Sequence, residues 1–159
     1  MEKRPFVRNE INNSFGFTLL EVLVTVAIVA VLLGLGYVNF RHFKANYDLT
    51  DAINQLYADL EWMRQKSMGS IHPYGITFSS TGYTIFKDLN DNQTYESGTD
   101  TLIKAEVFNS ISLSIASGCP NPLIFSRRGT PNGSCTVSLT NIYGRTKQIS
   151  ISQFKVRIQ

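Results

Sequence analysis

The stretch FTLLEVLVTVAIVAVLLGLGYV, residues 17–38, decides the fold of this chain. It runs for 22 residues with a single charged side chain, that of Glu21. A bilayer core about 30 Å thick is crossed by a helix of about 20 apolar residues. The sequence therefore predicts one membrane-spanning helix near the N-terminus.

The residues before this stretch carry more positive than negative charge. Lys3, Arg4 and Arg8 stand there against Glu2 and Glu10. The positive-inside rule then keeps the N-terminus in the cytoplasm and places the rest of the chain outside the membrane. A secretory signal peptide is the alternative, but its apolar run is usually about 7 to 15 residues long and ends in a small-x-small cleavage site. The sequence has neither feature, so we favour a membrane anchor.

The composition is that of one small domain with a low share of charge. Of 159 residues, 43% are hydrophobic and 17% are charged, whereas about 25% are charged in typical soluble domains. The 15 Lys and Arg exceed the 12 Asp and Glu only slightly, which neither indicates nor excludes nucleic-acid binding. The low charged fraction is explained by the apolar run.

Beyond this run the apolar residues follow a helical period. We predict that residues 39–68 continue the helix as an amphipathic segment that packs on a sheet. The helix should end near Met68, because Gly69 and a His-Pro pair follow. The apolar positions recur at spacings of three and four and are Leu49, Ala52, Ile53, Leu56, Tyr57, Leu60 and Met63.

From residue 69 to residue 159 the pattern changes to short runs of β-branched and aromatic residues separated by turn residues. The predicted strands are residues 74–79, 83–89, 101–108, 111–115, 122–126, 135–140, 147–152 and 154–158. The sequence therefore predicts an α+β fold, in which a long N-terminal helix packs on one or two small antiparallel sheets.

Glu21 lies five residues into the predicted span and needs an explanation. An acidic side chain in hydrocarbon costs on the order of 3 kcal/mol, and such a residue usually has a partner. The simplest interpretation is an ordinary single-span anchor with a stray glutamate.

The surrounding residues offer a more specific interpretation. Residues 16–35, GFTLLEVLVTVAIVAVLLGL, resemble the N-terminal segment of type IV prepilins and type II secretion pseudopilins, with agreement at Gly16, Phe17, Thr18, Leu19 and Glu21. The resemblance implies a pilin-like fold and a leader peptide of residues 1–16. It implies that a prepilin peptidase cuts between Gly16 and Phe17 and methylates the new N-terminus at Phe17. The α-amino group of Phe17 then pairs with Glu21 of a neighbouring subunit in the assembled filament.

A second resemblance covers the C-terminal half. A Gly-x-x-Phe strand at residues 75–78, an acidic loop from Asp88, a Leu-Ile-Phe-Ser-x-x-Gly segment at residues 123–129 and Gly144-Arg145 resemble the GspH or FimT family of minor pseudopilins. This implies a subunit at or near the tip of a type II secretion pseudopilus or a type IV pilus, which supports protein secretion or pilus biogenesis. It also implies a single-pass protein of the bacterial inner membrane with a periplasmic domain.

Cys119 and Cys135 lie in the part of the chain predicted to be periplasmic. In an oxidising compartment, two cysteines at this spacing can form a disulfide that contributes about 3 kcal/mol through loop entropy. The alternative is two buried thiols on different strands, because the sequence does not give the distance between the two Cα atoms.

The acidic loop invites a comparison with calcium sites. Asp88, Asn90 and Asn92 match the first, third and fifth positions of an EF-hand loop, but Gln93 replaces its glycine and Thr99 stands in place of its bidentate glutamate. An EF-hand is therefore excluded. A solvated turn is the default interpretation, and a pilin-type calcium loop is the alternative.

The sequence contains no motif for catalysis. GxSxG, HExxH, P-loop and GxGxxG patterns are absent, and His42 and His72 lie far from the cysteines, with no CxxC or HxxxH spacing. We therefore expect no enzyme activity, no cofactor and no metal site.

DNA uptake is the alternative function, since FimT-like members bind DNA through a basic C-terminal motif of the form Gly-Arg-x-Arg. Imperfect versions stand at residues 144–147 and 155–157. The candidate DNA-binding residues, which would meet phosphates, are Arg127, Arg128, Arg145, Lys147, Lys155 and Arg157. A solvated strand end with alternating charges is the simpler interpretation. An unrelated anchored periplasmic binding domain is a third reading, and it requires that Gly16 is not cleaved.

Overall fold

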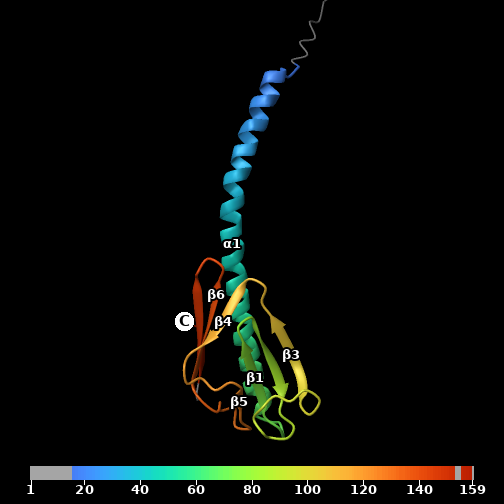
Figure 1. Cartoon of the computed structure of the whole chain (residues 1–159), viewed down its shortest axis with the longest axis vertical. Coiled ribbons are helices and arrows are strands. Elements are labelled where there is room, and N and C mark those ends of the chain that lie inside the picture. Colours follow the sequence, from blue (N-terminus) through green and yellow to red (C-terminus); the bar gives the residue numbers. More distant parts are fainter. Residues whose placement is uncertain (1–15, 153–154, 159) are drawn as a thin grey trace, which may run out of the picture. The chain divides into compact units, whose positions relative to one another are not determined.

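The structure is a computed structural model that describes residues 16–152 and 155–158 (Figure 1). Apart from Gly16, the predicted leader lies outside the described residues. The chain divides into two compact units, Met1–Asn39 and Phe40–Gln159, which we call the first and the second unit.

One long helix, α1 (Leu19–Ser67), contributes to both units. It ends at Ser67, one residue before the predicted position. The hydroxyl of Ser67 donates to the carbonyl oxygen of Met63 at 2.8 Å. Pro73 follows shortly afterwards, and proline cannot continue a helix because it lacks the backbone N–H. The predicted helix is therefore confirmed from Leu19 onwards.

Among the described residues, the second unit contains eight strands in two antiparallel sheets. The first sheet has the order β3-β2-β1-β5 and consists of β1 (Tyr74–Ser79), β2 (Gly82–Lys87), β3 (Thr101–Val107) and β5 (Leu123–Phe125). The second has the order β4-β6-β7-β8 and consists of β4 (Ile111–Ile115), β6 (Cys135–Asn141), β7 (Thr146–Ile151) and β8 (Val156–Ile158). The predicted α+β fold, a long helix on small antiparallel sheets, is confirmed.

Most predicted strand limits are within one residue of the structure, and β2 is the main exception. It ends at Lys87 rather than at residue 89, because the carboxylate of Asp88 accepts the backbone N–H groups of Asn92 at 3.3 Å and Gln93 at 2.8 Å. These bonds turn the chain out of the sheet. The last strand begins at Val156, and residue 154, where it was predicted to begin, lies outside the described residues.

The core of the second unit lies between α1 and the inner faces of both sheets. The apolar stripe of the helix is buried as predicted, while Tyr57 packs at its margin and Trp62 is 38% exposed and lies edge-on against Tyr74. The helix contributes Leu49, Ala52, Ile53, Leu56, Leu60 and Met63; the first sheet contributes Ile76, Phe78, Tyr83, Ile85, Leu123 and Phe125; the second contributes Ile111, Leu113, Val137, Leu139, Ile149, Ile151 and Val156.

Packing on the two faces of the first sheet explains the Gly-x-x-Phe pattern of β1. Phe78 is buried in the core. On the opposite face, a Cβ atom at Gly75 would lie 2.6 Å from Cδ1 of Ile124 and would also overlap the ring of Phe86. Only glycine therefore fits between these two side chains at this position.

A polar contact fixes α1 on the first sheet. One oxygen of Asp59, Oδ2, accepts the hydroxyl of Tyr83 at 2.6 Å and the ammonium group of Lys104 at 2.7 Å. Burial raises the pKa of Tyr83 far above its ordinary value, and the hydrogen bond to Asp59 raises it further. The hydroxyl therefore stays protonated and donates to the carboxylate.

Candidate functional site

The predicted processing site lies in non-helical backbone just before α1. Gly16, Phe17 and Thr18 precede the first helical residue, Leu19. The side chain of Phe17 is 82% exposed, and a Cβ atom at Gly16 would have no neighbour within 4 Å. The bond between Gly16 and Phe17 is thus accessible in the described structure.

Thr18 caps the helix, a role that the sequence analysis missed. Its Oγ1 accepts the backbone N–H of Glu21 at 3.2 Å, and its carbonyl oxygen accepts the N–H of Val22 at 3.2 Å. The Thr-x-x-Glu spacing is the sequence signature of a capping box, so the signal was present. Glu21 also stands in the first turn, where the positive end of the helix dipole favours a carboxylate.

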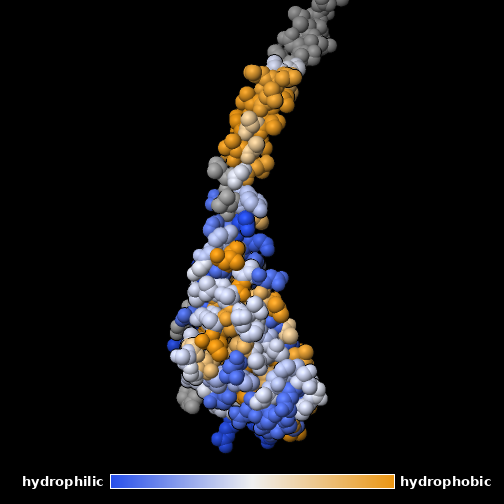
Figure 2. All heavy atoms as spheres, viewed as in Figure 1, coloured by the Kyte–Doolittle hydropathy of each residue, from blue (hydrophilic) through white to orange (hydrophobic). Residues whose placement is uncertain are grey.

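Apolar side chains surround the helix of the first unit. The large apolar residues between Phe17 and Leu33 are all between 49% and 82% exposed. Figure 2 shows them as a nearly continuous hydrophobic surface. Among the described residues, α1 is the one helix long and apolar enough to cross a membrane. So much contiguous apolar surface requires a membrane or other protein to cover it.

Cys119 and Cys135 are joined by a disulfide in the structure, with their Cα atoms 4.5 Å apart. Cys119 lies after β4 and Cys135 begins β6, both strands of the second sheet. Between them the chain crosses to the first sheet, where it forms β5. The bond therefore closes a crossover between the two sheets.

The acidic loop uses its carboxylates on its own backbone. Besides the two bonds that Asp88 accepts, Asp100 accepts the N–H groups of Leu89 at 3.0 Å and Glu96 at 2.8 Å. Asp88 is fully buried. Among the described residues, no group of three or more His, Cys, Asp and Glu side chains is arranged to hold a metal ion. The two acids thus have a structural role as acceptors for the loop.

An open cavity of about 500 Å³ lies beside this loop. Its lining includes Ile124, Asp91 and Arg127, and the last two form an ion pair with Nη2 and Oδ2 3.1 Å apart. Nδ1 of His72 lies 3.8 Å from Oδ1 of Asp91. The cluster brings three loops together, since its residues come from the segments before β1, after β2 and after β5.

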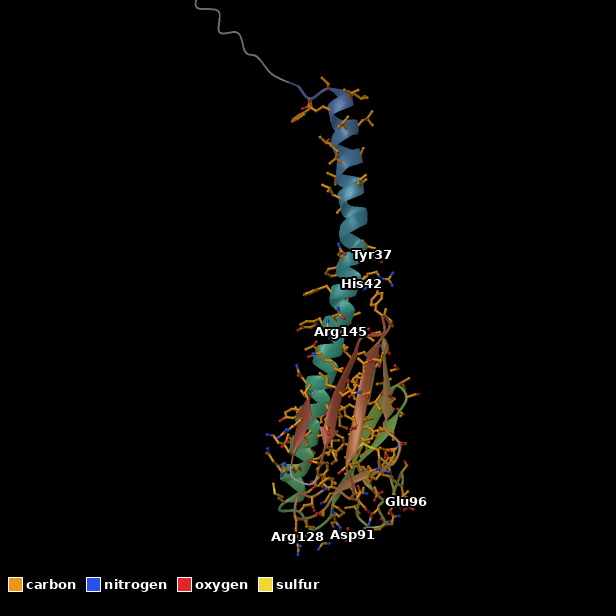
Figure 3. The ribbon with its side chains drawn as sticks, turned by 90° about the vertical axis from the view of Figure 1, so that its left-hand side faces the viewer. Tyr37, His42, Asp91, Glu96, Arg128 and Arg145 are labelled. Atoms are coloured by element: carbon orange, nitrogen blue, oxygen red, sulfur yellow. A yellow bond between two sulfur atoms is a disulfide. The ribbon has the colours of Figure 1, made fainter. Side chains whose placement is uncertain are left out.

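The six candidate DNA-binding residues do not lie together. Arg145 lies beside α1 near His42, whereas Arg128 lies at the opposite end of the second unit, near Asp91 (Figure 3). Arg128 and Arg145 therefore do not belong to one basic patch. The physical reason is that β6 carries the chain from one end of the second sheet to the other between these positions.

The remaining basic residues fall at two further positions of the second sheet. The ammonium group of Lys147 donates to Oγ1 of Thr50 on α1 at 3.1 Å. Lys155 precedes β8 and Arg157 lies within it. Val156 of this strand pairs with Ile151, at the end of β7 away from Arg145. The six residues are thus spread over the unit, and none of their contacts favours DNA binding.

Two family models match the chain. The model described as type II transport protein GspH matches residues 52–153, and the prokaryotic N-terminal methylation motif matches residues 11–37. None of the curated proteins compared with the chain matches it.

Solved structures share the fold. The type IV minor pilin FimU of Pseudomonas aeruginosa is 18% identical, with a TM-score of 0.58, and the match covers 74% of this chain and 92% of FimU. The minor pseudopilin EpsH of the type 2 secretion system of Vibrio cholerae is 14% identical, with a TM-score of 0.53, and the match covers 70% of this chain and 96% of EpsH. At these identities the likeness shows the fold alone.

Proposed function

The chain belongs to the GspH family of type II transport proteins, and from this membership we propose that it is a minor subunit of a type II secretion pseudopilus or a type IV pilus. The family is one of structural subunits, which assemble with other pseudopilins or pilins. In this role the second unit is the exposed head of the subunit, and the chain acts in secretion or pilus biogenesis as a component rather than as an enzyme.

The observation that carries the proposal is the contrast between two parts of α1. In the second unit the apolar stripe of the helix is buried by the two sheets of the same chain. Between Phe17 and Leu33 the large apolar side chains are exposed on all sides. A bilayer covers this surface before assembly, and the helices of other subunits cover it in a filament.

Processing precedes assembly in this proposal. A prepilin peptidase cleaves between Gly16 and Phe17, in the accessible backbone before α1, and methylates Phe17. The cut leaves a positively charged α-amino group one residue before the Thr18 cap. Once helices pack in a filament, that amino group pairs with Glu21 of a neighbour, which compensates the carboxylate in an apolar environment.

The proposed orientation places the N-terminus in the cytoplasm and the second unit in the periplasm. The excess of Lys3, Arg4 and Arg8 over the acidic residues before the apolar run supports this orientation. The Cys119–Cys135 disulfide agrees with it, because disulfides persist in an oxidising compartment such as the periplasm.

Substitution of Glu21 tests the proposal. We expect Glu21→Ala to be cleaved normally by the peptidase but to enter filaments at least tenfold less efficiently, since loss of about 1.4 kcal/mol corresponds to a factor of ten. Thr25→Ala is the matched control, because the Thr25 hydroxyl bonds within its own helix, to the carbonyl oxygen of Val22 at 2.9 Å. Equal incorporation of both variants would contradict the pairing.

A further inference from the structure

Strand β3 forms a free edge of the first sheet. Among the described strands it pairs only with β2, since it stands at the end of the order β3-β2-β1-β5. In Figure 1 it lies at the outer margin of the second unit. The strand is seven residues long, and its last four residues pair with β2 in a regular register. A strand edge of this kind offers a row of unpaired backbone groups to another chain.

The second half of β3 directs backbone groups out of the sheet. The N–H of Phe108, directly after the strand, donates to the carbonyl oxygen of Thr81, directly before β2, at 2.7 Å. Opposite residues of an antiparallel pair alternate between bonded and non-bonded positions, so Glu106 also faces β2, whereas Ala105 and Val107 face away. In the part of the chain that the structure describes, these outward groups form no backbone hydrogen bond.

The side chains in this half of β3 do not shield the edge. Charged side chains often protect an edge strand from addition of another strand. Here the ammonium group of Lys104 is bound to α1, through Oδ2 of Asp59 at 2.7 Å. Glu106 lies on the same side, with Oε2 3.9 Å from Nζ of Lys104. On the other side Ala105 is exposed and Val107 is 68% exposed. A strand added here would therefore bury apolar surface as well as form backbone bonds.

A groove with net negative charge adjoins the end of this edge. It has a volume of about 310 Å³, and its lining includes Glu106 and Val107 of β3 and Lys44, Asp48 and Asp51 of α1. Lys44 and Asp48 neutralise each other as an ion pair, with Nζ and Oδ2 3.5 Å apart. Within the described ranges, the side chain of Asp51 forms neither a hydrogen bond nor an ion pair. Asp51 and Glu106 thus make the groove suited to a cationic side chain.

We propose that the free edge of β3 binds an extended segment of a partner protein, which adds to the first sheet as a further strand and places a lysine or arginine in the groove. The backbone groups of Ala105 and Val107 supply the bonds of strand addition, and the groove favours basic segments over acidic ones. A second copy of β3 fits less well, because its one lysine, Lys104, is bonded to its own α1. The surface lies apart from the apolar helix of the first unit, so the inference goes beyond the proposed function.

Peptide binding to the full chain in detergent micelles tests this surface. The probe is a short fluorescent peptide in which valine and lysine alternate, and its anisotropy gives the dissociation constant. We expect a peptide of alternating valine and glutamate to bind about tenfold more weakly. A fully N-methylated valine–lysine peptide should not bind measurably, because it keeps its side chains but has no backbone N–H. In the parent chain, the bound valine–lysine peptide should slow hydrogen exchange at the amides of Ala105 and Val107.

Two substitutions separate the backbone contribution from the charge. Val107→Pro removes one outward N–H and should weaken binding of the valine–lysine peptide about tenfold, the equivalent of one lost hydrogen bond. Proline is tolerated at an edge where the N–H faces away from the sheet. Val107→Ala is the matched control, because it keeps the N–H, and it should weaken binding less. Asp51→Asn should weaken binding several-fold and reduce its dependence on salt.

The outcomes distinguish this inference from the proposed function. Equal binding of the N-methylated peptide, or unchanged exchange at Ala105 and Val107 in the peptide complex, overturns strand addition. The exchange measurement uses the parent chain and therefore decides even if Val107→Pro does not fold. Protection of both amides without peptide that is lost on dilution assigns the edge to a second copy and also overturns the proposal. None of these results affects filament assembly, which Glu21→Ala tests separately.

Discussion

Reduction of the Cys119–Cys135 disulfide is expected to lower the free energy of unfolding of the second unit by about 3 kcal/mol. The two cysteines are 16 positions apart in the sequence, and the loss of loop-closure entropy in the unfolded chain at that length amounts to about 3 kcal/mol at 25 °C. The closed segment includes β5, which crosses to the other sheet. The bond therefore restrains the segment that crosses between the sheets.

After reduction of the disulfide, hydrogen exchange should increase first in strand β5. It has only three residues and pairs with β1 along one edge. Its other edge is covered by its own loop, through bonds such as the N–H of Asn132 to the carbonyl oxygen of Ile124 at 2.9 Å. Reduction should accordingly speed hydrogen exchange at the backbone amides of Leu123–Phe125 before it changes exchange in β6.

The assay is guanidinium unfolding of the full chain in detergent micelles, with and without dithiothreitol, followed by the fluorescence of Trp62. Trp62 reports on the second unit because it contacts Tyr74 of β1. The double variant Cys119→Ala/Cys135→Ala should not respond to the reductant. A loss below about 1 kcal/mol in the parent chain would refute the reasoning from loop entropy.

Three further predictions concern polar contacts of the second unit. Asp59→Ala removes the acceptor of Tyr83 and Lys104 and should cost about 2 to 3 kcal/mol of unfolding free energy in the same assay. Because the pKa of Tyr83 is raised on folding, the unfolded chain loses this proton above about pH 10 while the native chain keeps it, so stability should fall there. Tyr83→Phe should remove that part of the pH dependence. Asn141→Ala leaves two backbone N–H groups and Asn46 without a partner and should speed hydrogen exchange of the β6–β7 turn by roughly tenfold, the equivalent of one lost hydrogen bond.

Matched controls keep these predictions specific. Asp51→Ala, an exposed acid on the same helix, should change stability by less than about 0.5 kcal/mol, and a cost equal to that of Asp59→Ala would contradict the role of the shared carboxylate. If the stability of Tyr83→Phe falls with alkaline pH as much as that of the parent chain, groups other than Tyr83 cause the fall. Unaltered exchange in Asn141→Ala would mean that the turn does not depend on that side chain.

Much of the fold could be predicted because burial imposes a period on the sequence. The stripe from Leu49 to Met63 repeats every three or four residues, and in β6 buried and partly buried residues alternate from Cys135 to Asn141. Strand limits were accurate where a turn follows directly. They failed at Asp88, where side-chain bonds to the following backbone end the strand early.

The contacts between distant segments could not be predicted in this way. Tyr83 and Asp59 are 24 positions apart, and Lys104 and Asp59 are 45 apart, so their meeting depends on the pairing of β2 with β3 and on the packing of α1 against the first sheet, not on a local pattern. The division of eight strands into two sheets, with β5 in the first, depends on the same long-range pairing.

The candidate site shows both sides of this limit. The processing and assembly residues lie within one short segment, so a local motif was enough to propose them. The same segment also contains the Thr-x-x-Glu spacing that indicates the Thr18 cap. Arg128 and Arg145 are only 17 positions apart, but a strand between them carries the chain to the other end of the unit. Their closeness in sequence therefore did not predict closeness in the structure.

The N-terminus and location of the chain in purified filaments test the central claim most directly. The measurement is mass spectrometry of the pseudopilus or pilus fraction, compared between cells with and without prepilin peptidase. We predict that the filament contains this chain in a small share relative to the major subunit, beginning at methylated Phe17, and that it disappears from the filament without the peptidase. A chain that keeps residues 1–16 and stays entirely in the membrane fraction of peptidase-containing cells would contradict the claim.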